Sequence, residues 1–165
     1  MGWFERKWVR LLVVAGVVFL LDVISKQIVL NTMPVGSGFP LINGFFDIVH
    51  VRNPGGAFGF LSGQSKAVRE FFFLFVTALA CGFIVWLYNS VPETHRILAA
   101  GLAMVLGGAL GNLLDRVRFG NVVDFIDWHI HDLHWPAFNI ADSFICIGVG
   151  ILIIHILLNR MPEEM

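Results

Sequence analysis

The stretch LLVVAGVVFLLDVISKQIVL, residues 11–30, decides the class of fold. It is almost entirely apolar over the length of about 20 residues that a helix needs to cross the hydrocarbon layer of a membrane. Three further stretches of similar composition follow, at residues 71–88, 97–116 and 140–159. The sequence therefore predicts four transmembrane helices.

The overall composition supports this assignment. The chain has 165 residues, of which 57% are hydrophobic and only 14% are charged, whereas about a quarter of the residues in a soluble domain are charged. The net charge is −1, and neither a basic stripe nor a zinc-finger spacing is present, so we expect no nucleic-acid partner. Cys81 and Cys146 lie inside apolar runs, and we interpret both as reduced thiols.

The first span is not interpreted as a cleaved signal peptide. Arg6, Lys7 and Arg10 precede the apolar run, as basic residues do in such a peptide. However, no small-x-small cleavage site follows, and Asp22 and Lys26 interrupt the run. We therefore predict that residues 1–165 form a single integral membrane domain.

The same basic cluster predicts the orientation, because positive charge favours the cytoplasmic side. A cytoplasmic N-terminus and four crossings place the C-terminus in the cytoplasm, with residues 31–70 and 117–139 outside. FFDIVHVRN, residues 45–53, alternates and is rich in strand-forming residues. A helix begins near Ser65. We predict an α-helical membrane protein with a small extracytoplasmic β-sheet and a surface helix.

Two carboxylates stand out between the last two spans. Asp124 and Asp142 are 18 residues apart, and the polar residues between them leave no room for a membrane crossing. Both must therefore lie on the same side of the membrane. Asp142 falls in the first turn of the last span, after Asn139, which is a suitable N-cap. Helix ends that meet in a bundle would bring the two carboxylates together.

The surroundings of these carboxylates favour acid–base chemistry. Apolar neighbours raise a carboxyl pKa, and a second carboxylate raises one of the two further. A helix N-terminus favours negative charge at Asp142, so we expect one shared proton near neutral pH with the anion at Asp142. Such a pair can activate a water and protonate a leaving amine. The alternative is that Asp124 and Asp142 are helix caps or interfacial anchors.

The third span ends in a polar group on one helical face. Asn112, Asp115 and Arg116 recur at i, i+3 and i+4. Arg116 is expected to pair with Asp115 and also to present its fork to a peptide carbonyl; the alternative is a purely structural ion pair at the helix end. Gly107 and Gly111 form a GxxxG pair that allows a neighbouring helix to approach closely.

Other ionisable residues have simpler interpretations. Asp22 and Lys26 lie one turn apart and predict a mutual pair that faces the bundle. Asp127 is expected to face water or to cap a local turn. HIHDLH, residues 129–134, has a spacing that can serve zinc, but histidine and tryptophan also suit an interfacial loop. We expect no metal and no cofactor.

Four motifs then resemble a known family. RNPGGAFG (52–59), GNLLDR (111–116), VVDFID (122–127) and FNIADS (138–143) fall in the order found in bacterial lipoprotein signal peptidase, also called signal peptidase II. The pair in the first span, Asp22 and Lys26, also matches. The resemblance spans nearly the whole chain.

This resemblance implies an aspartic endopeptidase of the cytoplasmic (inner) membrane with its active site at the outer face. It implies cleavage of a prolipoprotein just before a cysteine that carries diacylglyceryl, with an Asp dyad and a water. A globomycin-type inhibitor would occupy the same groove. As a separate hypothesis from the residues, we expect the outer sheet and its Gly-rich turn at 53–60 to close over the site and exclude bulk water. The matched positions are catalytic Asp124 and Asp142, substrate-binding Asn53, Asn112, Arg116 and Asn139, and supporting Asp22, Lys26, Gly108, Asp115 and Ala141.

Three rival functions remain open from the residues. A small multi-pass proton-coupled carrier would use Asp22, Lys26, Asp124 and Asp142 as a relay, although these acids cluster at one face and the chain lacks inverted internal symmetry. A metal hydrolase would centre on His129, His131 and His134. A structural or assembly protein would need none of this chemistry.

Overall fold

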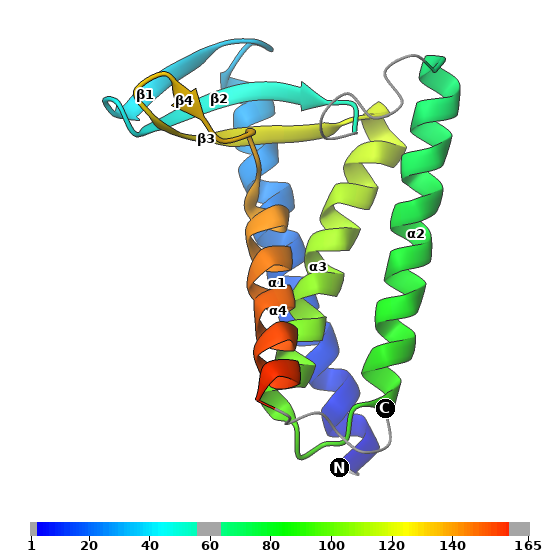
Figure 1. The fold of residues 1–165 in the computed structure, drawn as a ribbon. Helices are drawn as coiled ribbons and strands as arrows, with labels where there is room; N and C mark the ends of the chain where they lie inside the picture. The colour runs from blue at the N-terminus through cyan, green and yellow to red at the C-terminus, as the bar shows by residue number, and fades with distance from the viewer. Residues whose placement is uncertain (1–2, 56–63, 159–165) are drawn as a thin grey trace.

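Four long helices form the body of the molecule (Figure 1). The computed structural model describes residues 3–55 and 64–158. Each helix is long and apolar enough to cross a membrane, so the predicted multi-pass membrane architecture is confirmed. The helices are α1 (Trp3–Thr32), α2 (Lys66–Ser90), α3 (Arg96–Phe119) and α4 (Ile140–Leu157).

The helix ends follow from local sequence chemistry. The Ser65 hydroxyl accepts a hydrogen bond from the backbone of Val68 and so caps α2. This helix continues without a break into the second span, so the helix predicted from Ser65 is its first turn and not a separate surface helix. At the C-terminal end of α3, Gly120 adopts a left-handed φ of 73°, and its N–H donates to the carbonyl oxygen of Arg116.

A small antiparallel sheet lies across one end of the bundle (Figure 1). Its strand order is β1-β2-β3-β4. The β2–β3 pairing joins the two outer segments, with Val51 opposite Asp124. The strands are β1 (Gly38–Ile42), β2 (Phe46–Asn53), β3 (Val122–Ile130) and β4 (Leu133–His134).

The strand predicted within residues 45–53 is confirmed, but the position expected for Asp124 is wrong. We expected this carboxylate at a helix end. Instead, α3 stops at Phe119 and Asp124 lies on β3, the strand that leads away from it. The chain therefore brings a strand, and not a second helix end, up to the start of α4.

Glycines let α3 pack closely against two helices. A Cβ on Gly107 would lie 2.5 Å from the Ala15 carbonyl of α1, and one on Gly111 would meet the Asp22 side chain. The predicted GxxxG contact is thus confirmed, with α1 as the partner. A Cβ on Gly108 would lie 2.5 Å from the Ala141 carbonyl of α4. These glycines therefore allow the backbone of α3 to contact the backbones of α1 and α4 directly.

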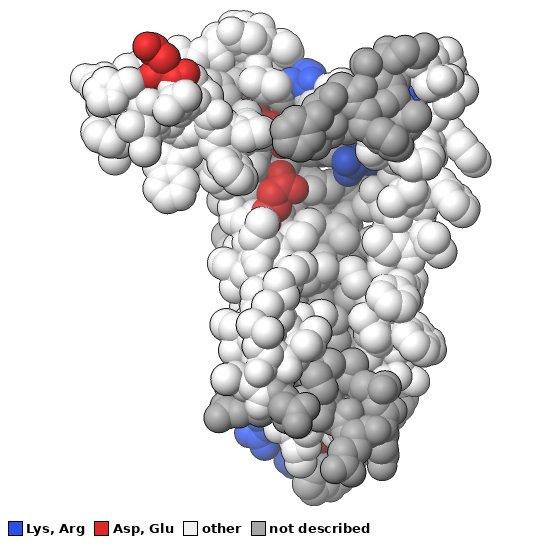
Figure 2. Space-filling view, in the orientation of Figure 1, with Lys and Arg blue, Asp and Glu red and all other residues white. Residues whose placement is uncertain are grey.

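The outer surface of the bundle is apolar. Leu12 and Phe71, for example, are 72% and 70% exposed. In Figure 2 the middle of the bundle shows no Lys, Arg, Asp or Glu, and the charged atoms gather at its two ends. A surface of this kind is suited to lipid and not to water.

Candidate active site

Asp124 and Asp142 meet at the junction of the sheet and the bundle. Asp124 is carried by β3 and is 1% exposed. Asp142 is the third residue of α4 and is only partly buried. Figure 2 shows acidic and basic atoms in the hollow below the sheet, at the top of the helices. The two carboxylates are joined there by the side chains of two asparagines.

The first of these is Asn139, the N-cap of α4. Its amide nitrogen donates to Asp124 Oδ1 at 2.7 Å and to Asn112 Oδ1 at 3.2 Å. Its amide oxygen accepts from the backbone N–H of Asp142 at 3.0 Å, and the Asp142 carboxylate accepts from the Asn139 N–H at 3.3 Å. This capping box means that the residue that starts the helix also orients both carboxylates.

The second is Asn112, on α3. Its amide nitrogen donates to Asp142 Oδ1 at 2.8 Å. Its amide oxygen accepts from the Lys26 ammonium at 2.9 Å. Because an ammonium can only donate, Lys26 fixes which end of the Asn112 amide faces Asp142.

A buried ionic cluster supports this asparagine. Lys26 Nζ lies 2.7 Å from Asp22 Oδ2 and 3.1 Å from Asp115 Oδ2. Asp22 also accepts from the Ala141 N–H at 2.9 Å, and Asp115 accepts from the Val123 N–H at 3.0 Å. The cluster therefore links α1, α3, α4 and β3. The predicted Asp22–Lys26 pair is confirmed.

The predicted pair of Arg116 with Asp115 is wrong, because Asp115 binds Lys26 instead. Arg116 donates to the Asn112 carbonyl at 3.3 Å, and its guanidinium lies 5.9 Å from the centre of the Phe73 ring. Its charge interacts with the carboxylates of Asp142, Asp124 and Asp115, in decreasing order. Within residues 3–55 and 64–158, the guanidinium makes no other hydrogen bond.

Asn53 approaches Asp124 from the end of β2. Its amide nitrogen donates to Asp124 Oδ2 at 2.9 Å, and its oxygen accepts from the Gly55 N–H at 2.8 Å. Gly55 has a φ of 86°, which glycine adopts at little cost. Residues 56–60 of the Gly-rich turn, which we expected to close over the site, lie outside the described residues.

Burial dominates the electrostatics of Asp124. Desolvation raises the pKa of its carboxyl from 3.8 to about 6, and the charge of Asp142 acts in the same direction. Hydrogen bonds from Asn53 and Asn139 act against this rise because they stabilise the anion. The site therefore contains a carboxyl group that can hold a proton close to neutral pH.

A largely aromatic pocket of 860 Å³ opens beside Asp142. It lies between the sheet and α4, and Trp128 and Trp135 contribute rings that are more than half exposed. Such amphipathic rings are typical of a membrane interface. The lining residues are Phe45, Trp128, His129, Ile130, Leu133, His134, Trp135, Phe138, Asp142, Ser143 and Cys146.

The histidines of the sheet form pairs with carboxylates. His129 Nε2 lies 3.2 Å from Asp47, His134 Nδ1 lies 2.9 Å from Asp127, and the two imidazoles stack at 4.5 Å. Asp127 thus lies on β3 and binds His134, where we expected it to face water or cap a turn. No group of three or more metal-ligating side chains occurs in residues 3–55 and 64–158. The Asp47 contact was missed because it joins residues 82 positions apart.

Comparisons with known proteins agree with this architecture. The family model described as Signal peptidase (SPase) II matches residues 14–158. A lipoprotein signal peptidase of Desulforapulum autotrophicum is 48% identical over 158 residues, 96% of this chain and 98% of the relative. One of Syntrophus aciditrophicus is 44% identical over 160 residues, 97% of this chain and 99% of the relative.

A solved structure described as a bacterial membrane enzyme has the same fold. Its TM-score is 0.79 at 35% sequence identity, covering 94% of this chain and 93% of that one. A second structure with the same description gives 0.78 at 33% identity, covering 89% and 92%. With the family match over residues 14–158, these similarities show that the chain is a membrane peptidase of the signal peptidase II family.

Proposed function

We propose that the chain is an aspartic endopeptidase that removes the signal peptide from prolipoproteins just before a diacylglyceryl-modified cysteine. The observation that carries this proposal is the buried link from Asp124 through Asn139 and Asn112 to Asp142. It joins two carboxylates of different burial at the rim of the bundle. Family membership supports the cleavage of lipoprotein signal peptides, and this link supports the aspartic mechanism.

The two carboxylates have different roles in the proposed reaction. Asp142 is the anion, because it sits at the N-terminus of α4 and accepts from Asn112. It takes a proton from water, whose oxygen attacks the carbonyl carbon before the lipidated cysteine. Asp124, whose buried carboxyl has a pKa raised to about 6, gives its proton to the cysteine nitrogen as the C–N bond breaks.

The negative charge that develops on the carbonyl oxygen needs donors. Arg116 is best suited, because its single hydrogen bond within the described chain leaves other N–H groups unused. Asn53 lies beside Asp124 and can contribute its amide. Asn112 and Asn139 both contact Asp142 and are hydrogen-bonded to each other, so we assign them the task of positioning the dyad.

The substrate would enter from the bilayer. The pocket beside Asp142 is lined mostly by apolar and aromatic side chains and would accept an apolar segment of the substrate. A globomycin-type inhibitor would compete there. Arg10 pairs with Glu93 at the end of the bundle opposite the sheet, and basic residues at that end favour the cytoplasmic side. We therefore place both termini in the cytoplasm and the dyad at the outer face of the inner membrane.

The direct test is cleavage of a purified lipidated prolipoprotein by the wild type, Asp124→Asn and Asp142→Asn. Loss of general acid or base catalysis is expected to slow cleavage by about 10²–10⁴-fold. Asp127→Asn, three residues along the same strand, should cleave at the wild-type rate. Full activity in either dyad variant would reject the mechanism. Equal cleavage of the unlipidated precursor would reject the lipid requirement.

The rival functions predict different results. EDTA should leave cleavage unchanged, whereas a metal hydrolase based on the histidines would lose it. A carrier would move protons across the membrane of a proteoliposome in the absence of a prolipoprotein. A structural protein would show no cleavage in the wild type, so the same assay separates it from a peptidase.

A further inference from the structure

We propose that His50 positions Asn53 for the reaction by holding a bulge in β2, which puts Asn53 on the face of the sheet that carries Asp124. This inference rests on the proposed function, because the Asn53 contact matters to cleavage only if Asp124 takes part in it. Within the described residues, the His50 side chain bonds to neither carboxylate of the dyad. His50 is therefore a positioning residue and not a catalytic one.

The bulge lies in the middle of β2. Ile48 is opposite Ile126 on β3, whereas Val51 is opposite Asp124. Residues 49–50 of β2 therefore stand across from a single residue of β3, which is the count that defines a β-bulge. The extra residue shifts the register of the rest of the strand by one position.

This shift decides which face of the sheet Asn53 occupies. In an antiparallel pair, side chains that are directly opposite share a face, and so do residues two positions apart on one strand. Val51 is opposite Asp124, so Asn53 lies on the same face, where its amide nitrogen reaches Asp124 Oδ2 at 2.9 Å. If the pairing ran on regularly from Ile48, Asn53 would be opposite Asn121 and its side chain would lie on the other face.

His50 anchors the bulge through both its side chain and its backbone. The side chain is 2% exposed, and its Nδ1 lies 2.8 Å from the carbonyl oxygen of Met33. Because this oxygen can only accept, Nδ1 is the donor, and Nε2 has no hydrogen-bond partner in residues 3–55 and 64–158. The His50 N–H donates to the Ser37 carbonyl at 2.9 Å, and the His50 carbonyl accepts from the Gly36 N–H at 2.8 Å. The bulge is thus tied to the segment that connects α1 to β1.

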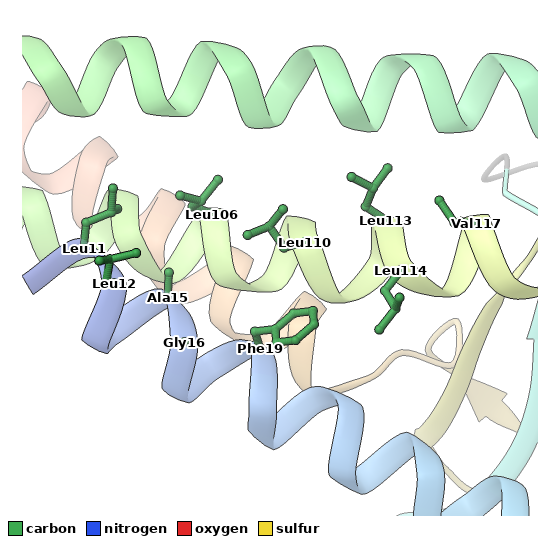
Figure 3. Close-up of a pocket in the computed structure, with 10 residues that line it drawn as sticks. All are labelled: Leu11, Leu12, Ala15, Gly16, Phe19, Leu106, Leu110, Leu113, Leu114 and Val117. Atoms are coloured by element: carbon green, nitrogen blue, oxygen red, sulfur yellow. The ribbon is translucent and has the colours of Figure 1, made fainter. Parts of the chain in front are cut away.

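The anchor point on Met33 belongs to the end of a well-packed helix. Met33 directly follows α1, and its N–H donates to the Val29 carbonyl at 2.9 Å. α1 runs along α3, and apolar side chains of both helices line a groove between them (Figure 3). Between this groove and Met33, Lys26 of α1 binds Asp115 of α3 at 3.1 Å. His50 therefore connects the bulge to a helix whose position relative to α3 is fixed.

The first test measures the register itself and needs no peptidase activity. Arg52→Cys and Val123→Cys form one cysteine pair, because these positions are opposite each other in the bulged register at the spacing that a disulfide requires. Ile48→Cys and Ile126→Cys form the matched control pair, because they are opposite each other before the bulge. Both pairs are made in a chain in which Cys146→Ser removes the exposed native thiol.

Oxidation should cross-link both pairs when His50 is present. His50→Leu keeps the position apolar but removes the donor, so it should lower the yield of the 52–123 cross-link severalfold and leave that of the 48–126 cross-link unchanged. His50→Asn carries an amide donor close to the position of Nδ1 and should restore the yield. Equal yields of the 52–123 cross-link in the wild type and in His50→Leu would overturn the proposal.

The second test measures the pH profile of kcat/KM with a lipidated prolipoprotein. Asn53 stabilises the Asp124 anion, so its loss from that face should move the midpoint of the profile to higher pH. His50→Leu should raise the midpoint as Asn53→Leu does, and the double variant should show no further shift. Val29→Ala, which opens a cavity in the apolar cluster between α1 and β3, should lower the unfolding temperature without moving the midpoint.

The outcomes distinguish this inference from the proposed function. A wild type that does not cleave the lipidated substrate contradicts the function, and the cross-links still report the register. If the wild type cleaves but His50→Leu lowers only the unfolding temperature, His50 has a structural role alone and the inference is overturned. Additive shifts in the double variant would also overturn it, because His50 would then act on Asp124 independently of Asn53. His50→Gln, whose donor lies beyond the position of Nδ1, replaces His50→Leu if the leucine variant does not fold, and the same results are expected of it.

Discussion

Asn139 Nδ2 lies 2.7 Å from Asp124 Oδ1, although the two residues belong to different elements. The amide oxygen of the same asparagine caps the helix that carries Asp142. One side chain therefore begins α4 and sets the positions of both carboxylates. A change at this residue should affect stability through the cap and catalysis through the contact with Asp124.

These two effects can be separated with Asn139→Ser and Asn139→Ala. Serine retains an oxygen that caps the helix but cannot reach Asp124, whereas alanine provides neither contact. Both variants should lose cleavage on the order of 10²-fold, because the dyad is misplaced. In thermal unfolding, the free energy of unfolding should be about 1 kcal/mol lower for the alanine variant than for the serine variant, which is the typical contribution of an N-cap. A serine variant with wild-type cleavage would show that the contact with Asp124 is dispensable.

The pKa of Asp124 predicts the pH dependence of cleavage. The folded protein holds this proton up to about pH 6, above the ordinary value of 3.8. The contribution of Asp124 to stability is thus fully present below about pH 4 and is lost as pH rises through 6. If Asp124 is the general acid, kcat/KM should fall as the pH rises through about 6. The midpoint of this fall belongs to the dyad as a whole.

Asn53→Leu should move that midpoint to higher pH. Its hydrogen bond stabilises the Asp124 anion, so removing it raises the pKa of that carboxyl further. Asn31→Leu, at an exposed position on α1, should leave the midpoint unchanged. The measurement is the pH profile of kcat/KM for the three proteins. A profile that rises through pH 6 would make Asp124 the base and exchange the two roles.

Lys26→Met should lower the stability of the bundle more than replacement of a surface cation does. It leaves Asp22 and Asp115 buried without their counter-charge, a loss that typically costs about 3–5 kcal/mol. Lys66→Met breaks a pair whose lysine is 75% exposed and should barely change the unfolding temperature. The measurement is thermal unfolding in detergent. Equal midpoints for the two variants would mean that the buried cluster contributes no stability.

The transmembrane helices could be predicted because each is encoded by its own apolar run. The strand β3 could not, because its sequence VVDFIDWHI does not alternate cleanly, and its partner β2 lies about 70 residues earlier. The strand forms because α3 has ended at Phe119, and the backbone N–H and C=O groups of the residues that follow Gly120 find their hydrogen-bond partners on β2. Local sequence patterns therefore placed Asp124 at the same end of the bundle as Asp142, as the structure has it, but on the wrong kind of element.

The sequence predicted the pair of Asp22 with Lys26, but it did not predict the partners of Asp115 and Arg116. Asp115 and Arg116 are adjacent in sequence, and adjacent side chains on a helix point in different directions. Asp115 accordingly faces Lys26, while Arg116 lies over Phe73. The link from Asn139 to Asn112 depends on how closely α3 and α4 pack, which no single segment of the sequence determines.

Gly108→Ala tests whether that close packing holds the dyad together. The added methyl group would lie 2.5 Å from the Ala141 carbonyl, a backbone atom that cannot rotate away. The start of α4 must then move away from α3, which lengthens the Asn112–Asp142 hydrogen bond, and overpacking typically costs about 1–3 kcal/mol. Gly150→Ala, on the same pair of helices, would meet nothing within 4 Å. It should retain full cleavage and gain up to about 1 kcal/mol from better helix propensity. Cleavage rates and unfolding temperatures of the two variants check this expectation, and wild-type activity in Gly108→Ala would show that the carboxylates do not depend on the distance between α3 and α4.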